Sequence, residues 1–517
     1  MKRHAFLVAA GILLSRLVGL VRLRVFAHYF GLRSDAADAF NAAFRIPNFL
    51  QNLFGEGVLS ASFIPVYAGL LARKDEEEAR RVAGAVASLL ALTTSVLVLL
   101  GVLFTPLLID AIAPGFEGEK RELAIRLVRI LFPGAGLLAL SAWCLGILNS
   151  HRKFFLSYAA PVVWNVAMIA TLVIFGGRVG EFPLAAALAW GSVAGSALQF
   201  GAQLPVVLRV ARGIAPGLRL TPHVREVIRN FAPVFVSRGV VQLSAYIDAL
   251  LASLLPTGAV TGLTNAQLLY TLPVSLFGMS VSAAELPAMS SAVGSEEEVA
   301  AYLRRRLDAG LRQIAFFIVP SAVAFLTLGD VVAGALLETG RFTRADSLYV
   351  WGILAGSSIG LLAGTLGRLY ASTYYALHDT RTPLRFAVLH VVLATALGYT
   401  AAVPLPHWIG ADPRWGVAGL TASASAAAWV EFHLLRRTLN RRIGRTGLPA
   451  AFSAKLWGAA ALAAAAAWVV KLAIGARHPV LGAALILGPY GLVYFGLAWL
   501  LRIPELRAIR IPGRRQM

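Results

Sequence analysis

Long apolar stretches alternate with short polar ones along almost the whole chain. About fourteen of the apolar stretches reach the ~20 residues that an α-helix needs to cross the hydrocarbon of a bilayer. The pattern therefore predicts an all-α, polytopic membrane protein. The predicted spans are 5–30, 37–70, 83–112, 123–148, 157–177, 184–208, 228–255, 264–292, 310–338, 347–377, 383–403, 415–437, 453–474 and 480–501.

Composition agrees with this class. Of 517 residues, 58% are hydrophobic and 14% are charged, and the mean hydropathy is +0.72. A water-soluble domain would have too little polar surface to cover such a chain. The formal net charge of +21 falls in short basic clusters without an aromatic-basic surface, so no nucleic acid partner is expected. The single cysteine, Cys144, excludes a disulfide framework within the chain.

Basic residues mark one side of the membrane. When alternate loops between the predicted spans are assigned to opposite sides, one set contains roughly 29 Lys and Arg and the other roughly 8. The basic set includes both ends of the chain. Because cytoplasmic loops carry the excess of basic residues, we expect both termini in the cytoplasm.

Two parts of the chain repeat the same order of features. Residues 58–65 end in Ile-Pro and residues 281–287 end in Leu-Pro, and an acidic and then a basic run follows each. The copies lie about 222 residues apart, which predicts two six-helix lobes of the same orientation, related by an axis along the membrane normal. The predicted domains are an N-terminal lobe (1–225), a C-terminal lobe (226–445), and a C-terminal helix pair with a cytoplasmic tail (446–517).

Four arginines lie inside the first two predicted spans: Arg16, Arg22, Arg24 and Arg45. One arginine at the centre of a membrane helix costs about 2.5–3.5 kcal/mol on insertion scales, so it normally faces a protein interior or a water-filled cavity. We therefore expect a cationic cavity. Guanidinium forks match phosphate geometry and keep their charge, which points to an anionic, phosphorylated cargo.

Several motifs occur in a fixed order along the chain. The first two spans contain Ser-Arg-Leu-Val-Gly-Leu-Val-Arg (15–22), Phe-Arg-Ile-Pro-Asn (44–48) and Leu-Phe-Gly-Glu-Gly (53–57). Later segments include Ala-Pro-Gly-Phe (113–116), Gly-Arg-Phe-Thr (340–343) and Asp-Thr-Arg-Thr-Pro (379–383). Together they resemble the MurJ (MviN) family of lipid II flippases, within the multidrug/oligosaccharidyl-lipid/polysaccharide exporter superfamily.

The resemblance implies a fold, a cargo and a location. It implies fourteen helices in a V-shaped pair of lobes in the bacterial cytoplasmic (inner) membrane. The expected cargo is lipid II, an undecaprenyl-pyrophosphate-linked disaccharide-pentapeptide, moved from the inner to the outer leaflet by alternating access. Membrane lipids and the cell-wall synthesis and division machinery are the other partners that it suggests.

The same resemblance assigns roles to the arginines. Arg16 and Arg22 match cavity arginines of the family and are carried over as headgroup-binding residues. Arg24 and Arg45 either join this cavity or have a structural role, and Arg24 lies close enough to His28 and Tyr29 to reach the outer interface.

The sequence also departs from the family pattern. Leu268 and Gln51 stand where many members have arginine, which removes positive charge from the expected site. Arg238, in the seventh span, either restores that charge from a neighbouring helix or extends to the cytoplasmic interface.

Two acidic residues, Asp38 and Glu56, lie near the arginines in the sequence. They are either ion-pair partners that reduce the cost of burial or parts of a gate. In the second case the carboxylate would pair with an arginine in one conformation and release it to the pyrophosphate in another.

A second polar group lies in the C-terminal half of the chain. Asp248, Asp379, the Val391 carbonyl and Thr395 match by position the residues that hold sodium in some family members, although Tyr375 replaces an asparagine ligand. Hard oxygen ligands suit a small cation. The alternatives are proton coupling by one of the acids, structural pairing, for instance with Arg368, and capping of the next helix by Asp379. No other cofactor is expected.

Enzyme signatures are thin. No Walker-type phosphate loop or His-Glu-x-x-His motif occurs, so the sequence predicts a transporter and not an enzyme. The alternatives are a flippase of another polyprenyl-linked oligosaccharide or an exporter of the same superfamily, a membrane glycosyltransferase or polymerase acting on the same lipid, and a scaffold for the division machinery.

Overall fold

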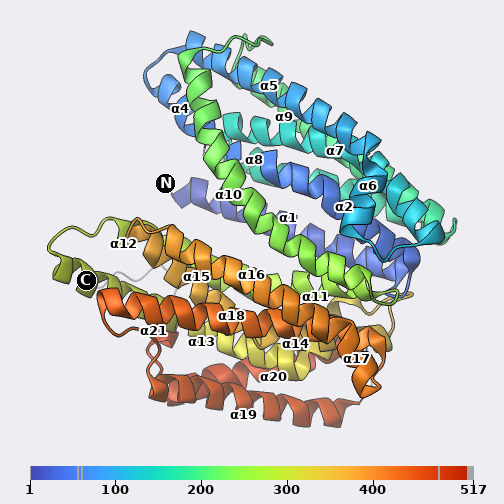
Figure 1. Ribbon diagram of the computed structural model, residues 1–517, viewed down its shortest axis with the longest axis vertical. Helices are drawn as coiled ribbons and strands as arrows, with labels where there is room; N and C mark the ends of the chain where they lie inside the picture. Colours follow the sequence, from blue (N-terminus) through green and yellow to red (C-terminus); the bar gives the residue numbers. More distant parts are fainter. Residues whose placement is uncertain (1, 55–57, 60–61, 476–477, 509–517) are drawn as a thin grey trace. The chain divides into compact units, whose positions relative to one another are not determined.

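The chain folds almost entirely into helices (Figure 1). The structure is a computed structural model that describes residues 2–54, 58–59, 62–475 and 478–508. Its longer helices are α1 (Lys2–Phe30), α2 (Asp35–Phe54), α5 (Glu76–Leu103), α7 (Gly118–Ser150), α8 (Phe154–Phe175), α9 (Glu181–Val210), α10 (Pro222–Ser253), α11 (Ala259–Pro273), α12 (Ser280–Ser290), α13 (Glu296–Leu337), α14 (Arg344–Ser358), α15 (Leu361–Ala376), α16 (Arg381–Ala402), α18 (Gly416–Ile443), α19 (Ala450–Ile474) and α20 (Pro479–Leu500). Short helices are α4 (Ile64–Ala72), α6 (Thr105–Ile112), α17 (Pro404–Ile409) and α21 (Glu505–Ala508).

Two compact units make up the fold. Unit 1 contains Met1–Thr261 and the turn Thr339–Phe342, and unit 2 contains Gly262–Glu338 and Thr343–Met517. Unit 1 includes α10, which contacts α2 and α5, whereas the repeat assigns that helix to the C-terminal lobe. The lobe boundaries deduced from the repeat stay a prediction.

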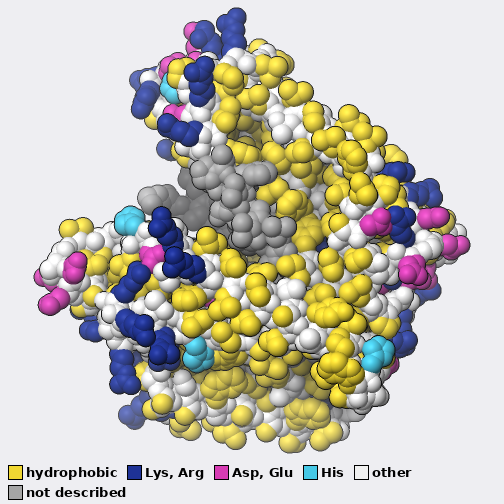
Figure 2. Space-filling view, viewed as in Figure 1, with side chains coloured by type: hydrophobic (Ala, Val, Ile, Leu, Met, Phe, Trp, Pro, Cys, Tyr) yellow, Lys and Arg dark blue, Asp and Glu magenta, His cyan; other side chains and the backbone are white. Residues whose placement is uncertain are grey.

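The helices have the length and composition of membrane spans. Among the described residues, nine helices are long and apolar enough to cross a bilayer, or ten if the bent pair α14 and α15 forms one span. The remaining predicted spans fall on α1, α2, α10 and α18, each of 20 residues or more. Hydrophobic side chains cover much of the helix flanks in Figure 2, and Lys and Arg gather near helix ends. The all-α, polytopic architecture is confirmed, and the total of fourteen spans stays a prediction.

Some predicted spans are broken helices. The span at 347–377 consists of α14 and α15, which meet at a bend of 42°. The span at 264–292 contains a π-helical segment, Val274–Met279, between α11 and α12. Pro273 directly precedes this segment, and a proline removes one backbone hydrogen bond and crowds the preceding turn, which accounts for the local change of winding.

A buried carboxylate joins the C-terminal helix pair to the rest of unit 2. Asp330 on α13 is 1% exposed, and Lys471 on α19 donates to its two carboxylate oxygens at 2.9 and 2.8 Å. Arg344, at the start of α14, forms an ion pair with the same group. The Lys471 ammonium also lies 4.3 Å from the centre of the Trp468 ring. The two ion pairs of Asp330 thus connect three helices, α13, α14 and α19.

Replacing Asp330 should weaken unit 2. Asp330→Asn keeps the shape of the side chain but leaves Lys471 without its counter-ion, and breaking a buried pair in this way costs about 3–5 kcal/mol. We expect a lower midpoint of thermal unfolding, followed by tryptophan fluorescence in detergent. Lys471→Met with Asp330→Asn should recover part of the loss. An unchanged midpoint in Asp330→Asn would contradict this role.

Candidate functional site

Arg22 has an aromatic environment inside unit 1. Its side chain is half-buried on α1, and its Cζ lies 5.0 Å from the centre of the Trp164 ring and 5.7 Å from the centre of the Phe44 ring. These two rings stack on each other with centres 5.7 Å apart. Nη1 donates to the sulfur of Met168 at 3.3 Å. Cation–π contacts of this kind stabilise a guanidinium without neutralising its charge.

One donor of Arg22 remains available. Its Nε is buried and makes no hydrogen bond to the described part of the chain. A buried donor without a partner costs about 1–3 kcal/mol, so it is normally satisfied by water or a ligand. A small cavity of about 10 Å³, enough for roughly one water molecule, has Phe44 and Trp164 in its lining. This arrangement can accept an anion that brings its own oxygen atoms to the guanidinium.

The other predicted arginines lie on the same two helices. Arg16 is exposed on α1, so its guanidinium is accessible at the surface of unit 1. Arg24 and Arg45 are half-buried. Asp248 and Tyr246 of α10 interact electrostatically with Arg45, and the Tyr246 hydroxyl donates to the Arg45 carbonyl at 2.5 Å. Arg45 is therefore tied to α10, whereas Arg16 is exposed and Arg22 has a buried donor without a partner in the described part of the chain.

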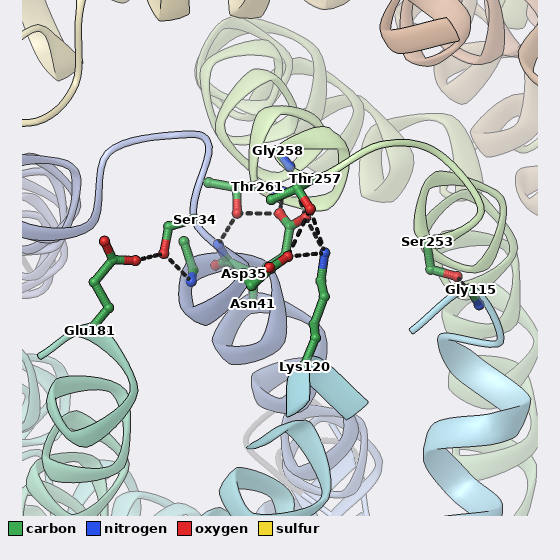
Figure 3. A network of polar contacts seen from close by, with 12 residues as sticks. Ser34, Asp35, Asn41, Gly115, Lys120, Glu181, Ser253, Thr257, Gly258 and Thr261 are labelled. Carbon is green, nitrogen blue, oxygen red and sulfur yellow. Dashed lines mark hydrogen bonds and ion pairs between the residues drawn. The ribbon is translucent and has the colours of Figure 1, made fainter. Parts of the chain in front are cut away.

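Asp38 belongs to a polar network, and Figure 3 labels its partners Lys120, Gly258 and Thr261. The Asp38 cluster, as we name it, consists of Asp35, Asp38, Lys120, Thr257, Gly258 and Thr261. Asp38 is 1% exposed; Lys120 donates to its Oδ2 at 3.0 Å and lies 3.1 Å from Asp35 Oδ1. The N–H groups of Gly258 and Thr261 each donate to Asp38 at 2.9 Å, and the Thr261 hydroxyl donates at 2.7 Å.

Asp38 therefore caps the first turn of α11. Its carboxylate satisfies N–H groups that a helix start leaves without partners and is placed favourably in the field of the helix. Its cationic partner is Lys120, at the start of α7, and not one of the arginines considered from the sequence. The carboxylate thus fastens α2 and α7 to the point where the chain leaves unit 1.

A second set of contacts surrounds the end of α1. Ser34 donates to Glu181 at the start of α9, and Arg341 forms an ion pair with the same glutamate. The Arg341 N–H donates to the His28 carbonyl at 2.9 Å. The turn at 339–342 packs so closely here that Gly340, with φ of +53°, has no room for a Cβ beside His28. These contacts hold together the end of unit 1 that also contains Asp35 and Asp38.

The sequence separations in the Asp38 cluster match the internal repeat. Asp35 and Thr257 are 222 residues apart, and Asp38 is 220 and 223 residues from Gly258 and Thr261. The offset deduced from the sequence is about 222, which is close to each of these separations. The contacts therefore support the internal repeat.

Two predicted site residues lie outside the described part of the chain. Glu56 belongs to the undescribed segment 55–57, and Arg238 lies in α10 at a position where the side chain is not described. Leu268 and Gln51, which replace family arginines, are half-buried on α11 and α2.

The predicted sodium ligands have other partners as well. Asp379 accepts hydrogen bonds from the Thr382 N–H at 3.0 Å and hydroxyl at 2.8 Å, and Arg442 pairs with it at 2.7 Å. Partial burial raises the pKa of Asp379, but these hydrogen bonds and the Arg442 charge outweigh it and hold the pKa below its usual value. Asp379 thus stabilises the first turn of α16, on which Val391 and Thr395 are half-buried.

Sequence reasoning missed Lys120, Glu181 and the 257–261 segment. All three belong to polar connections that looked like ordinary loops between spans. The sequence does contain one signal for the 257–261 segment, namely the repeat offset, because it relates the start of α2 to the start of α11.

The fold and the site together define the class of this protein, a polytopic membrane transporter. Its long apolar helices surround Arg22, which has an unsatisfied donor, and the Asp38 carboxylate, which caps α11, fastens helix ends at one side.

Comparison with known proteins identifies the family. The family described as "Lipid II flippase MurJ" matches residues 26–495. The "Lipid II flippase MurJ" of Burkholderia cenocepacia is 33% identical over 448 residues, covering 85% of this chain and 84% of that protein. The "Probable lipid II flippase MurJ" of Rhizobium meliloti is 31% identical, covering 82% of this chain and 78% of that protein. The chain belongs to the lipid II flippase MurJ family.

Solved structures share the fold. "Lipid II flippase MurJ, inward closed conformation" matches with a TM-score of 0.78 and 24% identity, covering 97% of this chain and 100% of that one. An inward-facing multidrug resistance MATE family transporter of the MOP superfamily matches with a TM-score of 0.66 and 19% identity, covering 83% and 95%. The predicted family, the multi-pass membrane location and the class of transporter, not enzyme, are confirmed.

The Asp38–Lys120 contact can be tested by a double-mutant cycle. Asp38→Asn and Lys120→Met should each lower stability by about 1–3 kcal/mol, because each leaves a buried charged group with fewer partners. The double variant should lose less than the sum of the two. Cys144 is buried in α7, so its labelling by a thiol-reactive dye reports unfolding of unit 1. Additive losses would show that the two groups do not interact.

Proposed function

We propose that this protein moves lipid II from the inner to the outer leaflet of the cytoplasmic membrane by alternating access. The observation that carries the proposal is the Arg22 site, which combines an unsatisfied guanidinium donor with aromatic packing in place of a carboxylate. The names of the relatives supply the cargo class. We infer that the pyrophosphate is held by Arg16 and Arg22.

The chemistry of the cargo suits this site. A pyrophosphate cannot cross hydrocarbon without compensation for its lost hydration, and bidentate guanidinium contacts replace that hydration with charge-assisted hydrogen bonds. Because no carboxylate pairs with Arg22 in the described part of the chain, binding need not first break an ion pair. The long isoprenoid tail can remain in the surrounding lipid.

The Asp38 cluster is the proposed closure at the outer end. By the distribution of Lys and Arg, the start of α2 faces away from the cytoplasm. Opening on that side would require residues 258–261 to leave Asp38, and the carboxylate would then need water or another donor. Cargo that interacts more strongly with the open arrangement would shift the population towards it.

The arginine assignment is tested by complementation in cells depleted of their own lipid II flippase. Arg16→Ala and Arg22→Ala should fail to restore growth, since losing one charge-assisted contact to phosphate weakens binding by about tenfold or more. Arg225→Ala, an exposed arginine on α10, is the matched control and should support growth. Membrane levels of each variant are measured by immunoblot.

Three other outcomes would change the interpretation. Growth with both arginine variants would refute the cationic site. Failure of well-expressed wild-type protein, also in a close relative of its source, would favour another polyprenyl-linked oligosaccharide as cargo, an alternative that the missing arginine at Leu268 supports. If cells that carry the Arg238→Ala variant fail to grow, Arg238 is the residue that replaces this lost charge.

We also propose a sodium ion as the coupling ion, bound through the Thr395 hydroxyl and the Val391 carbonyl of α16. These groups lie about 21 and 15 Å along the helix from the first turn that Asp379 caps, so Asp379 does not share the ion. Hydroxyl and carbonyl oxygens are donors that suit a small hard cation. Proton coupling through one of the acids is the alternative.

Sodium coupling is tested by thermal unfolding in NaCl against KCl at equal ionic strength. Sodium at 100 times its dissociation constant should stabilise the wild type by about 2.7 kcal/mol. Thr395→Val should abolish the difference without disturbing the cap at Asp379. Equal midpoints in both salts across the wild-type titration would rule sodium out and leave proton coupling.

A further inference from the structure

A groove on the surface of unit 1 lies apart from Arg22 and the Asp38 cluster. It has a volume of about 530 Å³ and follows one face of α7, with Trp190 of α9 completing its lining. Four α7 residues, at helical spacing and all exposed, form its floor: Glu122, Arg126, Arg129 and Pro133. Trp190 is itself 60% exposed. The groove is therefore open to whatever surrounds the helices.

The two arginines in the groove retain their charge. The neighbouring Arg121 is neutralised by Asp110, with Nε 2.7 Å from Oδ1. Arg126 and Arg129 form no ion pair within the described part of the chain. Glu122 lies one turn from Arg126, so the groove as a whole keeps a net positive charge.

The groove lies at the depth of lipid headgroups. At 1.5 Å per residue, α7 is about 50 Å long, well beyond the ~30 Å of the hydrocarbon. Arg126 and Arg129 lie about 12 and 16 Å from its start at Gly118, just before the segment 130–148, which contains no charged residue. Trp190 lies about 14 Å from the start of α9. Tryptophan and arginine at this depth are typical of a membrane interface.

Pro133 adds a hydrogen-bond acceptor. A proline has no N–H, so the Arg129 carbonyl, four residues earlier, has no helical donor. The groove thus offers two guanidinium donors, a carbonyl oxygen that lacks its usual helical donor, and an aromatic surface within one stretch of two helices.

We propose that this groove binds an anionic glycerophospholipid of the outer leaflet. Its phosphate lies between the Arg126 and Arg129 guanidinium groups, whose forks suit phosphate oxygens. A headgroup hydroxyl donates to the Arg129 carbonyl, and an acyl chain lies against Ile130 and Trp190. This site differs from the cargo site because it faces the surrounding membrane.

Native mass spectrometry of the full-length protein in detergent tests the site. Dioleoyl phosphatidylglycerol is titrated and compared with dioleoyl phosphatidylcholine. Arg126→Gln with Arg129→Gln should weaken binding of the tightest phosphatidylglycerol by about tenfold or more and leave phosphatidylcholine unaffected. Arg225→Gln with Arg229→Gln, an exposed pair on α10, is the matched control and should bind as the wild type does.

A second measurement uses the wild-type fold. Phosphatidylglycerol with brominated acyl chains should quench tryptophan fluorescence, and Trp190→Phe should remove part of the quenched signal. Arg126→Lys with Arg129→Lys keeps the charge and should bind more tightly than the glutamine pair. Any one of three results would overturn the proposal. The first is equal affinity of the wild type for both lipids, and the second is a loss of affinity in the α10 control equal to that in the Arg126 and Arg129 variant. The third is the same quenching in Trp190→Phe as in the wild type.

Discussion

The cost of placing a charge in hydrocarbon governs how these helices are arranged. Each buried charge has its own compensation. Asp330 is paired with Lys471 across two helices, and Asp38 is paired with Lys120 and with backbone N–H groups. Arg22 differs from these two, because aromatic rings and a thioether surround it and no carboxylate in the described part of the chain pairs with it. A structural ion pair would have been the less costly arrangement, so the unpaired arginine is the feature that calls for an external anion.

The Asp38 cluster shows how internal symmetry and transport are related. Its contacts join residues separated by one repeat length, as expected where equivalent helix starts meet. At such a point a small change in the relation between repeats disturbs many hydrogen bonds together. One buried carboxylate accepts from two N–H groups, a hydroxyl and an ammonium. In the closure that we propose, these hydrogen bonds would form or break together.

Arginines have three different environments in unit 1. Arg22 is the arginine that we propose for cargo, Arg45 is tied to Asp248 and Tyr246 of α10, and the Arg126–Arg129 pair is the one that we propose for a lipid headgroup. These arginines differ in their depth along the helices and in the groups around them, since the guanidinium group itself is the same in each. Formal charge along the chain therefore says little about function until each arginine is placed.

Hydrophobic periodicity alone determined the class of this protein. Long apolar runs predict spanning helices because a backbone in lipid must satisfy its own hydrogen bonds, and the motif order around Arg16 and Arg22 indicated the family. The partners of the charged residues were decided only by the tertiary structure. Lys120 lies 82 residues from Asp38, and Thr261 lies 223 residues away. Periodicity reports which face of a helix is apolar, whereas these contacts depend on how helix ends converge in space, and so the sequence predicted buried charges without revealing what neutralises them.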